Sequence, residues 1–347
     1  GVAPNGSFMP IRGLDAEWAC SDDVIADGIR WAADNGADVI NLSLGESGFI
    51  SRFTRGSSLN AASREVDAVG GGVIAAEMGH VFSALGSDVT LFNRSDTLLR
   101  AQDGDVSARF TEVFGRRVEL RLGHVPDRIR QEGDTIIVSW KDEELEFDEL
   151  LVASGRLPNT DLVDAAAGGL ETHHNGRLLV DEYMETNVPG VWALGDIAND
   201  WQLKHVANAE AKVVFGNLAN PDAKRAIDYS AVPSAVFSNP QVATVGVTEE
   251  QARAGGRRYR VGTRDFGGTA YGWALEDDTS FAKVIVDDET DLILGAHIIG
   301  PQAATLIQPL IQAVQFRQTA TSVAEDVFYI HPALSEVVEN ALLEAAG

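Results

Sequence analysis

The sequence is short of cysteine and of long apolar runs, and each shortage excludes a class of protein. Cys20 is the single cysteine among 347 residues, so the chain cannot form an internal disulfide and is not a disulfide-stapled scaffold. The apolar runs stay below the ~18 residues that span a bilayer. The first residues lack the pattern of a secretory signal, and metal-ligand spacing is absent. We therefore expect a cytoplasmic protein with no metal ion and no membrane partner.

Positive charge is also scarce. Lys and Arg number 27 against 52 Asp and Glu, which gives a formal net charge of −25 and a pI near 4.5. So acidic a chain repels nucleic acid. Only five of its basic residues are lysines. Acid excess with few lysines indicates a halophilic protein, because salt screens self-repulsion; an ordinary acidic cytoplasmic enzyme is the alternative.

The most specific pattern in the chain is typical of nucleotide binding and lies at 65–100. A strand over 66–69 precedes GGGVIA at 70–75, and a helix to residue 85 and a second strand over 88–92 follow. This is the G-x-G-x-x-A form of the dinucleotide fingerprint in its strand-turn-helix setting. Gly70 permits the tight turn, Gly72 lets the pyrophosphate approach the backbone, and Ala75 permits close helix packing.

The residues after the second strand favour NADPH. About 20 residues after the glycines, an NAD-dependent enzyme places an acid on the ribose. Here the chain has Asn93 and Arg94. An amide does not repel a 2′-phosphate, and a guanidinium can form a paired contact with it. The alternative is that Arg94 is a solvated loop charge.

Further segments, taken with this turn, resemble the pyridine nucleotide-disulfide oxidoreductases over about 65–347. They are ELLVASGRLPN at 149–159, VWALGDI at 191–197, PSAVFSNPQVATVGVTEEQA at 233–252, GAHIIGPQAATLIQPLIQA at 295–313 and HPALSEVVENALL at 331–343. The most similar branches are mycothione reductase, the dihydrolipoamide dehydrogenases and the bis-γ-glutamylcystine reductase of salt-loving archaea. The resemblance implies an α/β fold: a Rossmann-type NAD(P) domain over 65–159, the C-terminal part of an FAD domain over 160–229, and an α+β dimerisation domain over 230–347.

The resemblance also implies a proton-transfer pair near the C-terminus. In the family, the histidine that matches His331 protonates a thiolate leaving group, and the acid that matches Glu336 orients the imidazole. The pair serves the partner subunit, so a homodimer is expected. Without the resemblance, His331 would be an ordinary turn residue and Glu336 a helix-surface acid.

Contacts with FAD and NADPH are implied for six more residues: Glu77, Gly155, Gly195, Asp196, Lys204 and His205. An apolar strand over 191–194 would lead to Asp196, which would accept a hydrogen bond from the ribityl chain, and Gly155 would let the backbone turn against the cofactors. Lys204 and His205 would supply backbone donors from a loop, so His205 is not expected to act as an acid or base, and Glu77 would lie near the nicotinamide. The alternatives are a helix-capping turn residue for Asp196 and an exposed helix acid for Glu77.

Residues 1–46 resemble a different family. GVAPN at 1–5, WAADNGADV at 31–39 and VINLSLG at 39–45 are similar to subtilisin-like serine proteases. The pattern predicts a βαβ unit, followed by a Gly- and Ser-rich junction at 47–64. The catalytic segments of that family are not in the sequence, so protease activity is not expected. We predict a chimera, natural or recombinant, in which this unit takes the place of the first FAD βαβ unit.

Three functions stay open, because the sequence holds neither a redox Cys pair nor a second G-x-G-x-x-G for the ADP of FAD. The first is an FAD- and NADPH-dependent disulfide oxidoreductase for a low-molecular-weight thiol, incomplete and limited to passing hydride to a quinone or artificial acceptor. The second is a non-catalytic, dimeric nucleotide-binding remnant. A subtilisin-like protease is the least favoured.

Overall fold

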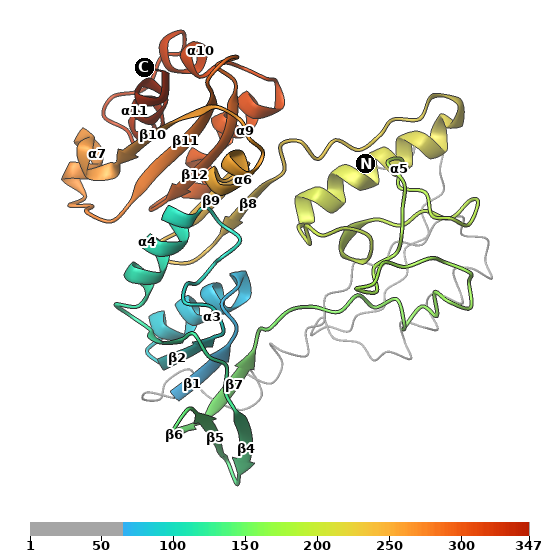
Figure 1. Ribbon diagram of the computed structural model, residues 1–347, viewed down its shortest axis with the longest axis vertical. Coiled ribbons are helices and arrows are strands. Elements are labelled where there is room, and N and C mark those ends of the chain that lie inside the picture. The colour runs from blue at the N-terminus through green and yellow to red at the C-terminus, as the bar shows by residue number, and fades with distance from the viewer. Residues whose placement is uncertain (1–64, 347) are drawn as a thin grey trace, which may run out of the picture. The chain divides into compact units, whose positions relative to one another are not determined.

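The computed structural model describes residues 65–346 (Figure 1). The protease-like segment 1–46, the junction 47–64 and Cys20 lie outside the described residues, so the expectations for them are not tested by the fold. Along residues 65–346, no helix combines the length and the apolar composition needed to cross a membrane.

The nucleotide-binding part is built on a parallel sheet of order β3-β2-β1-β7. β1 (Glu65–Val69) leads into α3 (Val73–Ala84), and β2 (Asp88–Asn93) pairs with β1 in parallel. β3 (Glu119–Leu122) and β7 (Glu149–Val152) complete the sheet. The predicted strand-turn-helix-strand order and the Rossmann-type architecture are confirmed.

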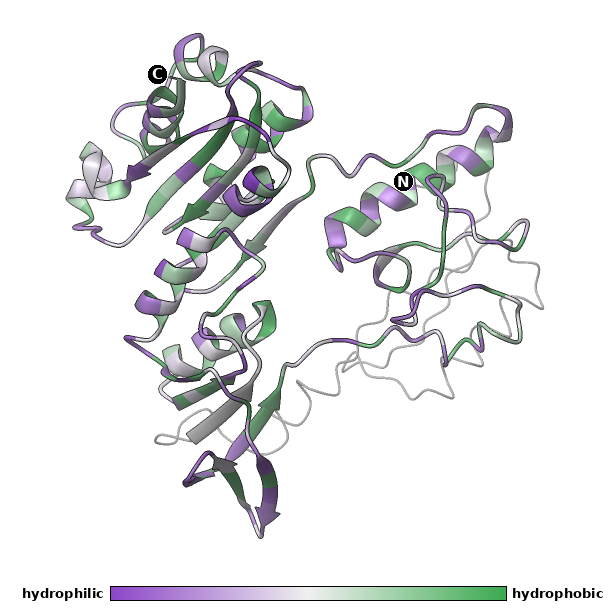
Figure 2. Ribbon diagram, viewed as in Figure 1, coloured by the Kyte–Doolittle hydropathy of each residue, from purple (hydrophilic) through white to green (hydrophobic). Residues whose placement is uncertain are grey.

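The helix α4 (Gly104–Phe114) precedes β3, and a small antiparallel sheet is inserted between β3 and β7. Its strands are β4 (Arg128–Glu132), β5 (Thr135–Trp140) and β6 (Glu143–Phe147). The sequence did not predict β4, because its polar composition gives no apolar alternation, as its purple colour in Figure 2 shows. This edge strand forms because its backbone pairs with β5.

The C-terminal part is an antiparallel sheet of order β10-β11-β12-β9-β8 with helices packed against it. The strands are β8 (Pro233–Val236), β9 (Val242–Gly246), β10 (Tyr259–Asp265), β11 (Phe281–Asp287) and β12 (Ile293–Ile299). The helices are α6 (Glu249–Ala254), α7 (Ala270–Ala274), α8 (Ala303–Leu306), α9 (Gln308–Gln315), α10 (Ala320–Glu325) and α11 (Ser335–Ala346). A Cβ on Gly262 would lie 2.0 Å from the Ala341 carbonyl oxygen, so glycine permits α11 to pack closely on β10.

The described residues form two large apolar cores. One lies within the C-terminal part, between its sheet and α9, α10 and α11. The other joins the nucleotide-binding part to the C-terminal sheet, because Phe110 and Phe114 of α4 belong to the same buried cluster as Val242 and Ile299. The α/β prediction for the nucleotide-binding part and the α+β prediction for the C-terminal part are confirmed.

Residues 153–203 differ from the prediction. The strand expected at 191–194 is wrong: only Trp192 pairs there, through an isolated bridge with Glu185. The physical reason is local, since the Thr186 N–H donates to the Val191 carbonyl, and the chain satisfies its backbone groups by folding back on itself. The short turns η1 (Gly195–Ile197) and η2 (Pro221–Ala223) flank the one long helix of this part, α5 (Lys204–Ala219).

Candidate functional site

The glycine turn between β1 and α3 has the geometry that the fingerprint predicts. Gly70 has φ +139°, and a Cβ there would lie 2.4 Å from the Ala153 carbonyl oxygen after β7. Ala75 is fully buried on α3. Gly72, the residue before the first turn of α3, faces open space where a Cβ would stand. The backbone N–H groups at the start of α3 are therefore accessible to a phosphate.

Asn93 shapes the loop that follows β2. Its side-chain nitrogen donates to the Ser95 carbonyl at 3.1 Å and to the Thr97 carbonyl at 2.9 Å. The Leu99 N–H donates to the Gly71 carbonyl at 2.8 Å, which ties the loop to the glycine turn. The amide of Asn93 is thus used to hold the loop, a role that the sequence did not indicate.

Two arginines project from this loop. Arg94 and Arg100 are exposed, and neither forms a hydrogen bond or ion pair with the described part of the chain. Arg94 was predicted from the sequence, whereas Arg100 was not. The sequence indicates Arg100 only as a second arginine six positions after Arg94, next to Leu99. Since no described residue engages them, both guanidinium groups can bind an anion beside the nucleotide turn.

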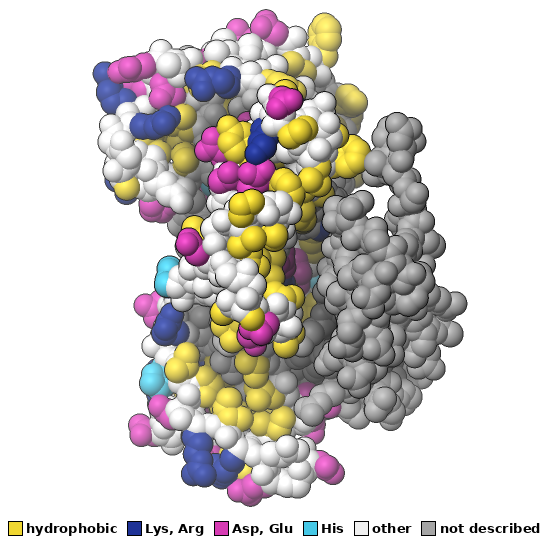
Figure 3. Space-filling view, turned by 90° about the vertical axis from the view of Figure 1, so that its right-hand side faces the viewer, with side chains coloured by type: hydrophobic (Ala, Val, Ile, Leu, Met, Phe, Trp, Pro, Cys, Tyr) yellow, Lys and Arg dark blue, Asp and Glu magenta, His cyan; other side chains and the backbone are white. Residues whose placement is uncertain are grey.

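Glu77 on α3 is neither fully exposed nor free. Its Oε1 accepts a hydrogen bond of 2.9 Å from the Phe237 N–H, in the loop after β8. The carboxylate therefore links the nucleotide-binding helix to the C-terminal part. Large apolar side chains stay exposed nearby, among them Val73 and Ile74 on α3. Figure 3 shows hydrophobic side chains along much of one face of the molecule.

The structure brings two predicted loops together. Gly155 has φ +136° with open space at its Cβ position. Its neighbour Arg156 lies 3.4 Å from an oxygen of Asp196, and both side chains are about half exposed. An exposed pair at that distance contributes little to stability. Asp196 is therefore an accessible acceptor, held mainly by the backbone of its own turn.

A buried carboxylate holds that turn. Glu210 of α5 is fully buried and accepts from the Gly195 N–H (2.6 Å), the Asn199 side-chain amide (2.7 Å) and the Tyr229 hydroxyl (2.5 Å). Burial, and then the hydrogen bond to Glu210, raise the pKa of Tyr229. The sequence analysis did not single out Glu210, because an acid in a helix of mixed polarity gives no sign of burial.

Lys204 and His205 are the first two residues of α5, so the prediction that they lie in a loop is wrong. Leu203 precedes the helix without a side-chain cap, and the first N–H groups of a helix have no intrahelical partner. The N–H groups of Lys204 and His205 belong to this first turn. The Nε2 atom of His205 donates to the Pro233 carbonyl at 2.8 Å, which supports the expectation that this side chain is not an acid or base.

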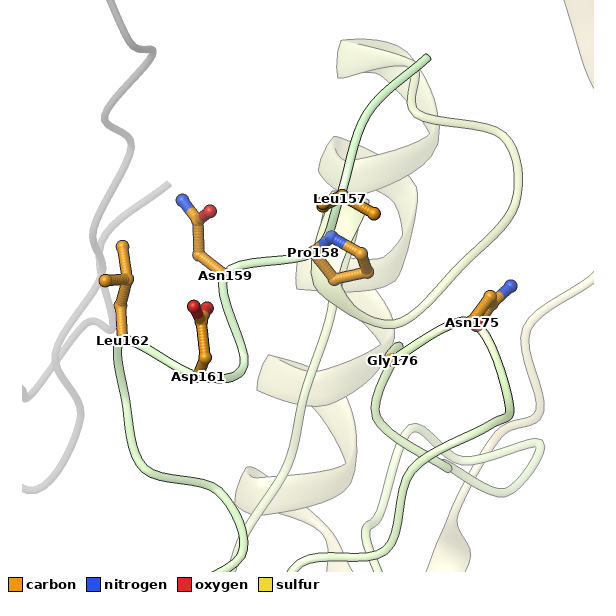
Figure 4. A pocket seen from close by; sticks show the side chains of 7 residues that line it. All are labelled: Leu157, Pro158, Asn159, Asp161, Leu162, Asn175 and Gly176. Carbon is orange, nitrogen blue, oxygen red and sulfur yellow. The ribbon is translucent and has the colours of Figure 1, made fainter.

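A pocket of about 470 Å³ lies beside the loop that follows Gly155 (Figure 4). Its lining comes from two segments: Leu157, Pro158, Asn159, Asp161, Leu162, Asn175 and Gly176. Thr160 links the two segments, since its hydroxyl donates a hydrogen bond to the Gly176 carbonyl at 2.7 Å. Leu157 and Leu162 are strongly exposed, so this loop presents an apolar surface.

His331 and Glu336 meet as the resemblance implies. The His331 Nδ1 lies 2.8 Å from Glu336 Oε1, and the Ala333 N–H donates to Oε2 at 3.1 Å. The hydrogen bond from His331, followed by that from Ala333, lowers the pKa of Glu336. The His331 side chain is 70% exposed against 16% for Glu336, so a fixed acid orients an imidazole that faces outward.

A second charged group is buried between α4 and the C-terminal sheet. The Lys283 ammonium lies 2.9 Å from Asp103, 2.6 Å from Asp105 and 2.7 Å from Glu249. Although burial opposes it, hydrogen bonds to Asp105, Glu249 and Asp103 raise the pKa of Lys283. Lys283 and Asp103 are almost wholly buried, so the group joins two parts of the fold.

Two further titratable residues of the C-terminal part have structural roles. His297 is fully buried in β12, its Nε2 donates to the Val247 carbonyl at 3.1 Å, and burial lowers its pKa. The Thr244 hydroxyl therefore donates to Nδ1, at 2.5 Å. Tyr329 packs partly inside and donates to the Val323 carbonyl at 3.1 Å.

Comparison with protein families identifies the class. The chain belongs to the pyridine nucleotide-disulphide oxidoreductases: the family model matches residues 24–211, and the model for the dimerisation domain matches 232–342. The first match begins inside the segment that resembles subtilisin-like proteases. The NAD(P), partial FAD and dimerisation architecture is that of this family.

Individual proteins and solved structures of this family are also similar to the chain. Mycothione reductase from Mycobacterium tuberculosis is 47% identical over 280 residues, which cover 79% of this chain and 61% of the reductase. Dihydrolipoyl dehydrogenase from Halobacterium salinarum is 38% identical, over 80% of this chain and 60% of the relative. Among solved structures, LpdA from M. tuberculosis has a TM-score of 0.75 and 26% identity, covering 82% of this chain and 62% of LpdA. The chain thus spans about three fifths of the length of these relatives.

Proposed function

We propose that this protein is an FAD- and NADPH-dependent disulfide oxidoreductase of the mycothione or bis-γ-glutamylcystine reductase type, and that it is incomplete because this sequence holds neither a redox Cys pair nor a second G-x-G-x-x-G. The glycine turn carries the proposal, because Gly70 packs against Ala153 while Gly72 leaves the start of α3 open. We divide the chain into a protease-derived segment (1–46), a junction (47–64), an NAD(P) domain (65–159), the C-terminal part of an FAD domain (160–229) and a dimerisation domain (230–347). It would work in the cytoplasm of an organism adapted to high salt.

The two exposed arginines support NADPH over NADH. The loop that carries Arg94 and Arg100 is bound to the glycine turn through Leu99 and Gly71, so both guanidinium groups would reach the ribose of a nucleotide bound at that turn. Hydrogen bonds to a charged group are worth ~1.5–3 kcal/mol each. Replacing either arginine with Gln should weaken NADPH binding about tenfold or more while NADH binding stays unchanged. Equal losses for both nucleotides would contradict the assignment.

The residues proposed for FAD fit a flavin. Gly155 leaves room for close approach, Asp196 offers an accessible acceptor for a hydroxyl, and the first turn of α5 at Lys204 and His205 offers backbone donors. When bound, FAD would pass electrons from the nicotinamide to an acceptor.

The proton for a leaving thiolate would come from His331. A carboxylate can only accept, so the hydrogen between His331 and Glu336 sits on Nδ1. Nε2 is then the atom that donates a proton to sulfur, which leaves a neutral imidazole still held by Glu336. Because His331 faces outward, the thiolate that it protonates would belong to the partner subunit of a homodimer.

The single cysteine limits what this sequence can do. A relay through a disulfide needs two sulfurs, and the chain has only Cys20. We therefore propose that, with this sequence alone, electrons pass from NADPH to a quinone or artificial acceptor. A dimeric, nucleotide-binding protein without catalysis is the second candidate, favoured by this same lack of a Cys pair.

The visible absorption spectrum of the protein, purified in high salt, tests the proposal. A near-stoichiometric oxidised-flavin band that bleaches on anaerobic addition of NADPH would support the oxidoreductase. A colourless protein that still binds NADPH would contradict it and leave the second candidate.

A further inference from the structure

The buried Glu210 carboxylate receives donors from three separate places. One oxygen accepts from the Gly195 N–H, and the other accepts from Asn199 and from the Tyr229 hydroxyl. Buried acids are rare and are stable only when hydrogen-bonded or paired. Here every donor is neutral, and one is a backbone group of the turn that leads to Asp196. The arrangement is therefore directed at that turn.

The carboxylate holds both ends of the turn. Gly195 opens it with φ +75°, in the left-handed region, and Asn199 lies just beyond its last residue. The other side-chain atom of Asn199, Oδ1, accepts from the N–H groups of Trp201 (2.8 Å) and Gln202 (3.1 Å). Glu210 thus fixes the path from the turn to the start of α5.

Asp196 depends on this path for its position. Among residues 65–346, its side chain contacts only Arg156, at 3.4 Å, and this exposed contact is too weak to orient it. We infer that Glu210 is a positioning residue: by binding Gly195 and Asn199 it fixes the turn that presents the Asp196 carboxylate to the ribityl chain of FAD. For the flavin contact, this inference rests on the proposed function.

The third donor extends the arrangement to the linker between α5 and β8. Tyr229 lies in that linker, and its ring lies 6.5 Å from the ring of Trp201, between centroids. Replacing Tyr229 with Phe removes one of the three donors that hold the carboxylate, which should loosen its contacts with Gly195 and Asn199 without removing them. This variant is a milder perturbation of the same carboxylate than a change at Glu210.

The first experiment needs no flavin. Glu210→Gln keeps the size of the side chain but places an NH₂ group against donors, so the turn should open. Hydrogen exchange of the Gly195 amide should be about tenfold faster or more than in the wild type. Glu171→Gln, the same change at an exposed acid in this part of the chain, is the control and should exchange as the wild type does. Exchange within about twofold of the wild type in Glu210→Gln would overturn the inference.

A double-mutant cycle tests the link to FAD. Asp196→Asn and Glu210→Gln should each weaken FAD binding about tenfold, and the effect of Asp196→Asn should shrink at least threefold when Glu210 is already changed. Additive effects would mean that Glu210 acts on general stability and not through Asp196. If the wild type binds no FAD, the proposed function fails, while the exchange experiment still decides the role of Glu210. Should Glu210→Gln not fold, Tyr229→Phe replaces it, with exchange at Gly195 about threefold faster expected and no change overturning the inference.

Discussion

The C-terminal part and the segment 160–229 reach their shapes by different means. The C-terminal sheet and its helices enclose a large core in which residues such as Ile298 and Leu310 are fully buried. The apolar cluster of the segment contains four buried residues, Ala165, Leu178, Ala193 and Ala198. Its turns are held instead by polar side chains, notably Asn187, which bonds to Glu171 and Gly169, and Glu210.

This difference indicates which interactions fix the geometry of each candidate site. Apolar burial is non-directional and stabilises roughly in proportion to area, whereas a hydrogen bond adds only ~0.5–1.5 kcal/mol but requires one geometry. His331 and Gly70 lie beside large cores, so their surroundings are stable before any polar contact forms. Asp196 lies where directional bonds set the backbone, so its position is sensitive to single polar changes.

The largest expected effect is at the charged group between α4 and the C-terminal sheet. Lys283→Met would leave the fully buried Asp103 without its cation, and breaking a buried ion pair costs ~3–5 kcal/mol. The free energy of unfolding from urea titration should fall by that amount. Lys212→Met, at an exposed lysine of α5, should leave it unchanged. A loss below ~1 kcal/mol for Lys283→Met would show that the group does not stabilise the junction.

Matched leucine truncations test the two cores directly. Leu310→Ala removes a fully buried side chain from the large core, and Leu178→Ala removes one from the small cluster. Leu→Ala changes cost ~2–5 kcal/mol according to how well the site collapses. We expect ~4 kcal/mol for Leu310 and ~2 kcal/mol for Leu178, from urea titration. Equal losses would contradict the difference between the two regions.

Acid should weaken the junction through the carboxylates around Lys283. Burial opposes it, but the Glu249 N–H and Lys283 lower the pKa of Asp103; the hydrogen bond from Lys283 lowers the pKa of Glu249. Both acids thus hold protons more weakly when folded, so their stabilisation is present above their unfolded pKa values, near 4. It is lost as pH falls through that value toward the folded pKa.

The Lys283→Met variant isolates this pH effect from the relief of the overall negative charge. Thermal unfolding of the wild type and the variant, followed between about pH 6 and pH 3, should show their melting temperatures converging as pH falls. A constant difference across the range would mean that these carboxylates do not titrate with folding.

The smallest effect is expected for a surface pair in the other region. Lys224 lies 2.6 Å from Glu185, and each side chain is about 30% exposed. Such pairs contribute ~0–1 kcal/mol, so Lys224→Met should change the free energy of unfolding by less than ~1 kcal/mol. The effect should shrink further in high salt, which screens the pair. A loss comparable to that of Lys283→Met would remove the contrast between buried and exposed lysines.

Prediction from the sequence succeeded where a pattern repeats with the period of an element. The turn at Gly70 and the strands on either side were predicted because glycine and apolar spacing report local backbone geometry. It failed at 191–194, where an apolar run satisfies its backbone locally instead of joining a sheet. It also placed Lys204 and His205 in a loop, because α5 begins without a side-chain cap that would mark its start.

The sequence by itself determined the nucleotide turn, because its residues lie within a few positions of one another, and the segments that resemble the family implied the pairing of His331 with Glu336. Only the tertiary structure decided the roles of Glu210 and Lys283. Glu210 binds groups 11, 15 and 19 positions away, and Lys283 binds Asp103 across 180 positions. An acid or a lysine in the sequence carries no mark of burial. The partners of Glu210 are set by how α5 packs on the turn η1, and those of Lys283 by how α4 packs on the C-terminal sheet.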